Sequence, residues 1–325
     1  MSTSGSTNFN LTTNQIIQET LELLGVLSSY ETASGEDYAT CLKSLNIMVK
    51  AWQNKGIMVT TETEGTVFLV KGQPGYQLGG SGPAKASGTN TVETYLTEAE
   101  TSGDTLMHVA STAGMTAADI IGVQLDDGDL FWTTIATVNS ATTVTLSAAI
   151  DDNSTSGFAV FSYTAAIGRP LHISSVRLRK SGSTTSPSAY SDYLLTELSR
   201  KNYYNTPNKF VQGLPVQYYF DRQATQTTLY VYLAPNQVSD RLKITYRRVI
   251  EDFDNTTDVA DLDPSWLGAI VYNLAVNISP KYSKEMKVAS VDFGIVKQKA
   301  MEYLDDAMSN AQEKTSMRFI PRLPF

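Results

Sequence analysis

The sequence predicts an α+β protein: a mainly helical core with β-strands and, inserted into it, a small all-β sandwich or barrel domain. Three observations indicate this class. Apolar residues at helical spacing occur near both ends of the 325-residue chain. Short alternating strands fill its middle. A run rich in glycine, serine and proline at 79–88 marks a boundary between them.

The composition narrows the class of protein. With 42% hydrophobic and 18% charged residues, the chain resembles ordinary globular proteins. No apolar run approaches the roughly 18 residues needed to cross a bilayer, and residues 1–10 lack the features of a signal peptide, so we expect no membrane role and no export. One cysteine, Cys41, and two histidines, His108 and His172, cannot form a Cys/His metal cluster. We therefore expect neither metal nor cofactor.

The formal net charge of -8 is unevenly spread along the chain. Residues 84–163 hold one basic and ten acidic side chains, whereas residues 164–250 hold twelve basic and four acidic ones. An acidic block is thus followed by a basic block. The acidic block would repel nucleic acid and belongs away from it.

The N-terminal region predicts a helical hairpin. Thr12 and Gln15 have the form of a capping box at the start of a helix that Gly25 stops. A second helix, from about 36 to 55, has one apolar stripe and ends at Gly56.

Residues 84–163 predict the inserted, acidic β-domain. Alternating patches occur at 120–125, 131–138, 144–146 and 158–161, and the sequence Asp126 to Asp129 between the first two suits a tight hairpin turn. A polar-faced helix is expected near 191–200, within a region of strands that runs from 169 to 248.

Two of those strands alternate cations with aliphatic residues, which puts the cations on one face of a sheet. The face could meet solvent, protein or DNA phosphates, and we rank solvent or protein above DNA because exposure to solvent is the usual fate of charged side chains. The cations are Arg177, Arg179, Arg241, Lys243 and Arg247.

Two more helices are expected after residue 250. Asp263 and Pro264 are a cap and first-turn proline for a helix that Pro280 ends. A last helix over 284–312 would be about 43 Å long. Its apolar stripe fits either a core helix or a seam between subunits, and its length favours the seam. The stripe includes Met286, Phe293, Val296, Ala300, Tyr303 and Ala307.

Residues 313–325 combine prolines, arginines and large apolar side chains, which predicts an extended docking tail rather than a helix. A disordered terminus is the alternative, although the composition is too apolar for a solvated tail. The docking residues would be Met317, Arg318, Phe319, Ile320, Arg322, Leu323 and Phe325.

The sequence contains no nucleophile elbow, phosphate-binding loop or dinucleotide fingerprint, so we expect no enzyme. Carboxylate pairs such as Glu62 with Glu64 and Asp126 with Asp127 keep a cell-wall glycoside hydrolase open as an alternative. Asp126, Asp127 and Asp129 could bind Ca²⁺, but a plain turn explains them better.

Seven elements in sequence order resemble the head-to-tail adaptor proteins of short-tailed bacteriophages, also called tail accessory or packaged-DNA-stabilising proteins. The resemblance covers about 1–80 and 168–325, and the block from 84 to 163 departs from the family pattern. The elements are Leu45–Ile57 (LNIMVKAWQNKGI), Gly75–Gly79 (GYQLG), Gly168–Ile173 (GRPLHI), Tyr218–Asp221 (YYFD), Leu229–Pro235 (LYVYLAP), Phe253–Pro264 and Leu274–Tyr282 (LAVNISPKY).

The resemblance implies a structural virion protein: a homo-oligomeric ring that joins the portal protein to the tail hub, nozzle or fibres and surrounds the DNA exit channel, with non-specific contact to genomic DNA at most. The C-terminal tail would reach the portal. A third possibility is a tail module that binds fibres or host glycans through the β-insert. The expected parts are residues 1–83 (helical hairpin and first strands), 84–163 (acidic insert), 164–312 (rest of the adaptor core) and 313–325 (docking tail).

Overall fold

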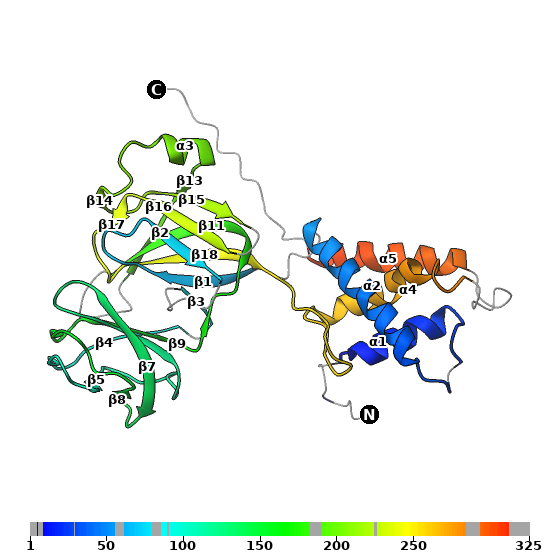
Figure 1. The fold of residues 1–325 in the computed structure, drawn as a ribbon, viewed down its shortest axis with the longest axis horizontal. Helices are drawn as coiled ribbons and strands as arrows, with labels where there is room; N and C mark the ends of the chain where they lie inside the picture. Colours follow the sequence, from blue (N-terminus) through cyan, green and yellow to red (C-terminus); the bar gives the residue numbers. More distant parts are fainter. Residues whose placement is uncertain are drawn as a thin grey trace. The chain divides into compact units, whose positions relative to one another are not determined.

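The fold is known from a computed structural model, which describes residues 5, 9–28, 30–55, 62–79, 86–89, 91–181, 190–223, 226–283 and 293–311. Its contacts divide the chain into two units (Figure 1). The helical unit combines Met1–Thr61 with Ile250–Phe325, and the β unit is Glu62–Val249.

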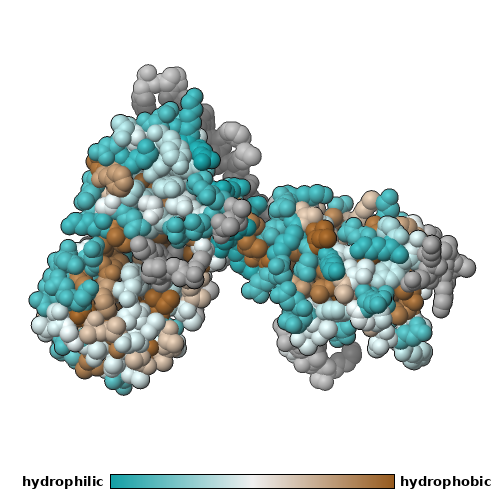
Figure 2. All heavy atoms as spheres, viewed as in Figure 1, coloured by the Kyte–Doolittle hydropathy of each residue, from teal (hydrophilic) through white to brown (hydrophobic). Residues whose placement is uncertain are grey.

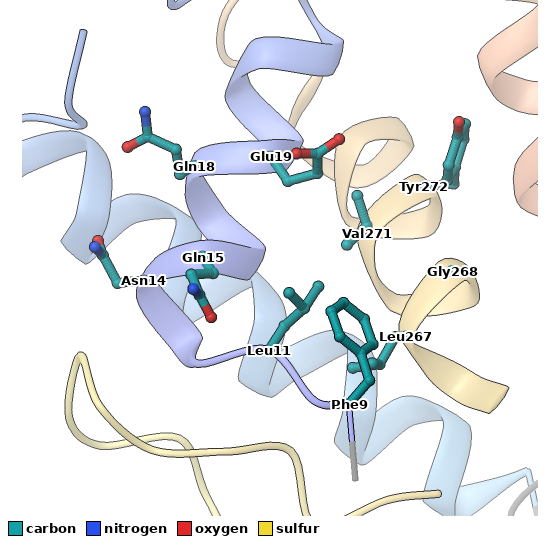
Figure 3. Close-up of a pocket in the computed structure, with 10 residues that line it drawn as sticks. All are labelled: Phe9, Leu11, Asn14, Gln15, Gln18, Glu19, Leu267, Gly268, Val271 and Tyr272. Carbon is teal, nitrogen blue, oxygen red and sulfur yellow. The ribbon is translucent and has the colours of Figure 1, made fainter. Parts of the chain in front are cut away.

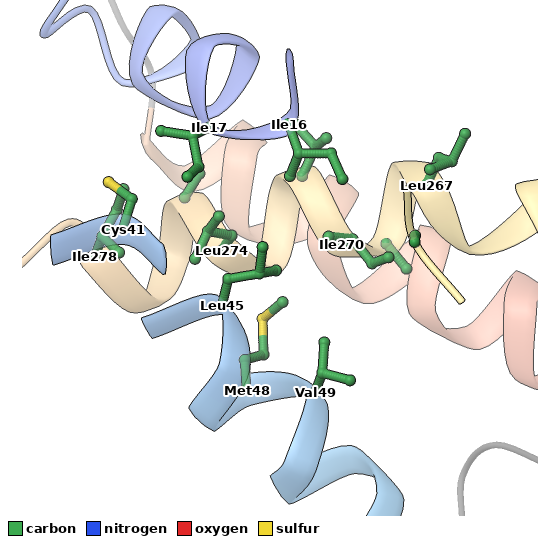
Figure 4. Packing of buried hydrophobic residues seen from close by; sticks show 14 of the residues in the cluster. Ile16, Ile17, Cys41, Leu45, Met48, Val49, Leu267, Ile270, Leu274 and Ile278 are labelled. Atoms are coloured by element: carbon green, nitrogen blue, oxygen red, sulfur yellow. The ribbon is translucent and has the colours of Figure 1, made fainter. Parts of the chain in front are cut away.

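The helical unit is built around its most apolar helix. The elements are α1 (Thr13–Leu23), α2 (Gly35–Asn54), the 3-10 turn η2 (Pro264–Trp266), α4 (Leu267–Ile278) and α5 (Phe293–Ala311). Ile270, Leu274 and Ile278 of α4 are buried, and α1 and α2 point Ile16, Ile17 and Leu45 toward them (Figure 4). Burial of α4 on several sides explains why its sequence is apolar nearly all round.

Local signals set the helix starts as the sequence predicts. The Thr12 amide donates to Gln15 Oε1 at 2.9 Å while the Gln15 amide donates to Thr12 Oγ1 at 3.4 Å, which confirms the capping box. The Asp263 carboxylate accepts from the Ser265 amide at 2.9 Å, with Pro264 in the first turn. Of the helices that the structure describes, none is long and apolar enough to span a bilayer.

The described residues of the β unit form three larger sheets and one two-stranded sheet. The central sheet has the order β10-β3-β1-β18-β11-β12, the outer sheet β13-β15-β16-β2, and the acidic sheet β4-β9-β6-β7-β8-β5, while β14 and β17 form a separate pair. Neighbours are antiparallel except β13 with β15 and β14 with β17.

The strands of the central sheet are β1 (Glu62–Phe68), β3 (Ala86–Thr89), β10 (Ala165–Ala166), β11 (Pro170–Ser181), β12 (Tyr190–Leu194) and β18 (Arg241–Arg248). Those of the outer sheet are β2 (Gly75–Leu78), β13 (Thr196–Glu197), β15 (Gln217–Arg222) and β16 (Thr227–Tyr232), with α3 (Arg200–Asn205) between β13 and the pair β14 (Gln212–Gly213) and β17 (Ala234–Pro235). Those of the acidic sheet are β4 (Val92–Tyr95), β5 (Leu106–His108), β6 (Ile120–Gln124), β7 (Leu130–Val138), β8 (Thr143–Leu146) and β9 (Ala159–Tyr163).

The central sheet is covered differently on its two faces because its strands alternate. One face packs Val67, Leu178 and Ile244 against the outer sheet, in a core that includes Tyr76 and Val231. The opposite face is polar, but its Phe68 packs against the acidic sheet in an aromatic cluster with Trp132, Phe161 and Tyr163. The central sheet therefore joins the other two.

The chain enters and leaves the acidic sheet at neighbouring positions. Strand β3 pairs with β10, so the chain entering the acidic sheet lies beside the chain leaving it. Just before them, Gly79 has φ +77°, and a Cβ there would lie 2.5 Å from Arg169 Cα. Only glycine allows this approach.

The expectation of a mainly helical core is wrong. Strands make up 35% of the structure and helices 26%, and the strands form several sheets. The region 169–248 contains long strands such as β11 and β18, whose alternating sequences pair over most of their length. These strands form a separate hydrophobic core in the β unit and do not pack on a helical core.

Two local expectations also need correction. The region 191–200 holds β12 and β13, and the helix starts only at Arg200. The last helix is described over Phe293–Ala311, so the stretch 284–292 of the expected helix, with Met286, lies outside the described residues. The predicted docking tail, 313–325, lies outside them as well.

Replacing Leu274 by alanine should destabilise the helical unit by about 3 kcal/mol, because its buried side chain would leave a cavity between α1, α2 and α4. Denaturant unfolding followed by helical circular dichroism would measure the change. Ile47→Ala, on the exposed face of α2, is the control and should change stability by less than about 0.5 kcal/mol. Equal effects would contradict the assigned packing.

Candidate functional site

The five cations that the sequence singles out do share one face of the central sheet. Arg177 lies opposite Lys243, and Arg179 lies opposite Arg241, across the β11–β18 pair. Carboxylates reach the same face from three strands: β1, β12 and β4.

Three of the cations pair with carboxylates at the sheet surface. Arg247 Nε lies 3.0 Å from Glu62 Oε1, and Arg177 pairs with Glu64 of the same strand. Arg179 forms two hydrogen bonds of 2.8 Å with Asp192, which fixes the geometry of the pair. The guanidinium lowers the pKa of the Asp192 carboxyl.

The remaining two cations converge on Glu93 of β4. The Arg241 side chain, only 3% exposed, pairs with the Glu93 carboxylate, and Lys243 Nζ lies 3.6 Å from it. Lys243 also donates to Thr66 Oγ1 at 2.7 Å. Burial lowers the pKa of Lys243, and the neighbouring Glu93 opposes that shift. Two cations of the central sheet thus share one carboxylate of the acidic sheet, which balances one of their two positive charges.

The five predicted cations therefore have carboxylate partners inside the same unit. Four carboxylates offset five cations, so the face keeps little net charge to attract phosphates. The partners that the structure shows for these cations belong to their own chain, and contact of this face with another protein stays a prediction.

The histidines and the cysteine have structural surroundings. Arg222 lies 2.7 Å from His172 Nδ1, and burial together with Arg222 and Arg247 lowers the pKa of His172. His108 Nδ1 lies 3.0 Å from Glu100 Oε1. Burial raises the pKa of the Cys41 thiol. Among the described residues, no group of three His, Cys, Asp or Glu side chains is arranged to hold a metal ion.

The carboxylates considered for hydrolysis are also engaged. The pKa of Glu62 is lowered overall. Burial alone would raise it, but the hydrogen bonds from Ser174 and Arg247 outweigh burial, so the carboxylate stays ionised at neutral pH. Asp126 accepts hydrogen bonds from the Thr155 amide and hydroxyl at 3.1 and 2.8 Å. Asp127 accepts from the Asp129 amide at 2.8 Å, as expected for a turn.

The apolar stripe of α5 faces its own chain. Val296, Ala300 and Ala307 are buried, and the Asn273 amide of α4 donates to the Ala300 carbonyl at 2.9 Å. Tyr303 packs on Tyr272 with ring centroids 5.1 Å apart. Phe293, also on the stripe, is half-buried against the same core. Val296, Ala300 and Ala307 are thus covered by their own chain, whereas Tyr303 is 38% exposed. Contact of this helix with a second subunit stays a prediction.

A groove between α1 and α4 was not foreseen from the sequence. It encloses about 570 Å³ and is lined mainly by apolar side chains, with amides on the α1 wall (Figure 3). Phe9 and Leu11, just before the Thr12 cap, form one wall, and Leu267 and Val271 the other. Such a groove suits an apolar group with a polar end. The sequence did not predict it, because Phe9 is not part of a periodic apolar pattern.

No family model matches the chain, and a comparison with curated proteins finds no match either.

Replacing Glu93 by glutamine should destabilise the β unit by about 3 kcal/mol, because Arg241 would keep a buried charge without its counter-ion. Glu64→Gln, which breaks the more exposed pair with Arg177, is the matched control and should cost less than about 1 kcal/mol. Chemical denaturation followed by tryptophan fluorescence would report both, since Trp132 lies in the β unit. A Glu93 variant as stable as the control would refute the role of the buried pair.

The Asp192–Arg179 pair should stabilise the fold in a pH-dependent manner. Because the folded pKa of Asp192 is lowered, its contribution is complete above the unfolded pKa near 4 and disappears as the pH falls through the folded value. Asp192→Asn should therefore cost up to about 1 kcal/mol at pH 7 and progressively less below pH 4. Denaturant unfolding curves at pH 7 and below pH 4 would measure the loss of stability in each condition. Asp151→Asn, which changes an exposed carboxylate, is the control and should have little effect at either pH.

Proposed function

We propose that the protein is a structural virion component, a head-to-tail adaptor that assembles as a ring between a portal and the tail of a short-tailed bacteriophage. The observation that carries the proposal is the ordered series of seven sequence elements that resembles that family.

The structure adds a physical reason for two of these elements. Gly75–Gly79 and Gly168–Ile173 are far apart in sequence, yet Gly79 meets the backbone of Arg169. The two elements thus form one junction, and the acidic sheet is inserted between them. A family pattern without the insert would retain the same junction, which fits the departure of residues 84–163 from it.

Three further elements make contacts that join the chain segments of the helical unit. Asn46, in the first element, accepts a hydrogen bond from the Phe253 amide at 3.0 Å and donates to the Phe253 carbonyl at 2.9 Å. Lys281, near the end of the last element, donates to Ser44 Oγ at 2.8 Å. These polar contacts hold the three elements together within one unit.

In the proposed mechanism, assembly rather than catalysis is the activity. The subunits associate weakly until a portal ring provides a template, and the C-terminal tail orders on the portal surface, so part of the binding free energy is spent on folding. Phe319, Ile320, Leu323 and Phe325 would supply the apolar contacts and Arg318 and Arg322 the charged ones.

Removing residues 315–325 should weaken binding to the cognate portal rings at least about tenfold, because each buried aromatic anchor contributes more than about 1 kcal/mol. Co-sedimentation of the full-length and shortened proteins with purified portal rings would measure it. Phe319→Ala with Phe325→Ala should reproduce most of the loss, whereas Thr315→Ala with Ser316→Ala should not. Unchanged binding of the shortened protein would overturn the docking role.

A further inference from the structure

The β unit exposes apolar and cationic side chains together on and after helix α3. We call Arg200, Lys201, Tyr204, Lys209, Phe210 and Val211 the α3 surface. Phe210 is 70% exposed and Tyr204 51%. Figure 2 shows an apolar area among hydrophilic atoms over the part of this unit that carries β14. Large apolar side chains grouped in this way on a protein surface mark a contact site.

The surface is rigid enough to serve as one. Tyr203, beside Tyr204, is buried and stacks on Tyr219 with ring centroids 5.4 Å apart, and Tyr219 stacks on Tyr230. This row of rings anchors α3 to the outer sheet. Lys209 donates to the Tyr204 and Thr206 carbonyls, which holds the segment after α3 in place.

The cations of the α3 surface differ from those of the central sheet. Arg200 lies over the Tyr204 ring, Lys209 donates to carbonyl groups, and neither has an ion pair with a carboxylate of a described residue. Lys201 is exposed and likewise forms no ion pair within the described part of the chain. Their charge is available to a partner.

The same unit carries the complementary charge on loops of its acidic sheet. The acidic sheet and α3 lie at opposite ends of the β unit (Figure 1). The loops after β6 and β8 meet, because the Asp126 amide donates to the Asn153 carbonyl at 2.9 Å. The first of them lies beside the turn after β1, where a Cβ on Gly128 would lie 3.6 Å from Lys71 Nζ. Leu106, in β5, adds an exposed apolar side chain to the sheet. We call Asp126, Asp127, Asp129, Asp151 and Asp152 the acidic loops; none forms an ion pair with a described cation.

We propose that the α3 surface of one copy docks against the acidic loops of a second copy. Among the described residues, no ion pair joins the two surfaces, so the charges of both are available to a second copy. A contact between unlike surfaces of identical chains is heterologous, so it repeats from copy to copy and closes into a ring when the rotation permits. The apolar side chains supply affinity, and the opposite charges select the register.

This inference rests on the proposed function for its ring, but it concerns the contact between copies and can be tested with this chain alone. Loss of portal binding on tail truncation would leave it intact, and its own failure would leave portal binding intact.

The test exchanges charges between the two surfaces. The first variant, Arg200→Glu with Lys201→Glu, makes the α3 surface acidic. The second, Asp129→Lys with Asp151→Lys, makes the loops basic and changes carboxylates that accept no hydrogen bond within the described structure. Lys43→Glu with Lys297→Glu, at exposed positions of the helical unit, is the control for the first variant's change in net charge.

Sedimentation of the full-length proteins at low and high salt would report self-association. We expect the wild type and the control to associate with rising concentration, more strongly at low salt, and each variant alone to associate at least roughly tenfold more weakly. An equimolar mixture of the two variants should associate like the wild type, because every α3 surface then finds loops of opposite charge.

Three results would overturn the proposal. The first is a wild type that remains monomeric at about 1 mM and low salt, the weak limit of specific binding. The second is association that neither variant weakens. The third is a mixture that associates no better than the separate variants while circular dichroism shows both folded.

Discussion

The buried cluster of Arg241, Lys243 and Glu93 constrains the arrangement of the β unit. A guanidinium that is 3% exposed needs a counter-ion at close range, since an uncompensated buried charge costs several kcal/mol. Glu93 supplies it from the first strand of the acidic sheet, and Phe68 packs on the aromatic residues of that sheet beside it. Charge and apolar contact together hold the acidic sheet against the central one.

The same cluster shows why segment charge is a poor guide to partners. Counted along the sequence, residues 164–250 form a basic block that invites a nucleic-acid interpretation. In three dimensions, Glu62, Glu64 and Glu93 arrive from outside that block and compensate most of its prominent cations. The available positive charge lies instead on Arg200 and Lys201, in a helix whose sequence shows no alternation to attract attention.

Local features of the fold were predictable because short-range chemistry decides them. Thr12 with Gln15, Asp263 with Pro264, and the turn at Asp126 to Asp129 each depend on atoms a few residues apart, and the structure has all three. The alternation around Arg177 and Lys243 likewise gave the correct faces of the sheet. The alternation could not predict which residues contact each face, because carboxylates such as Glu64 and Glu93 lie more than 100 residues away in the sequence from the cations that they pair with.

Two other expectations meet the same limit. The stripe of α5 is equally suited to a neighbouring subunit and to α4, and only the folded chain shows that Val296 and Ala300 meet α4. The balance of helix and strand was misjudged because the core of the β unit is assembled from non-local pairs such as β1 with β18. Periodicity identifies an apolar face, but the contacts that cover it are a property of the whole chain.

The junction at Gly79 and Arg169 has an evolutionary corollary. Since the ends of the inserted segment are neighbours, deleting or exchanging that segment would leave a gap that a short turn can bridge, and the β1–β18 ladder would survive. Such an exchange would nevertheless remove Glu93 and leave the buried Arg241 without its counter-ion. Related chains that lack the segment should therefore carry an uncharged residue at that position, or a carboxylate borrowed from another strand.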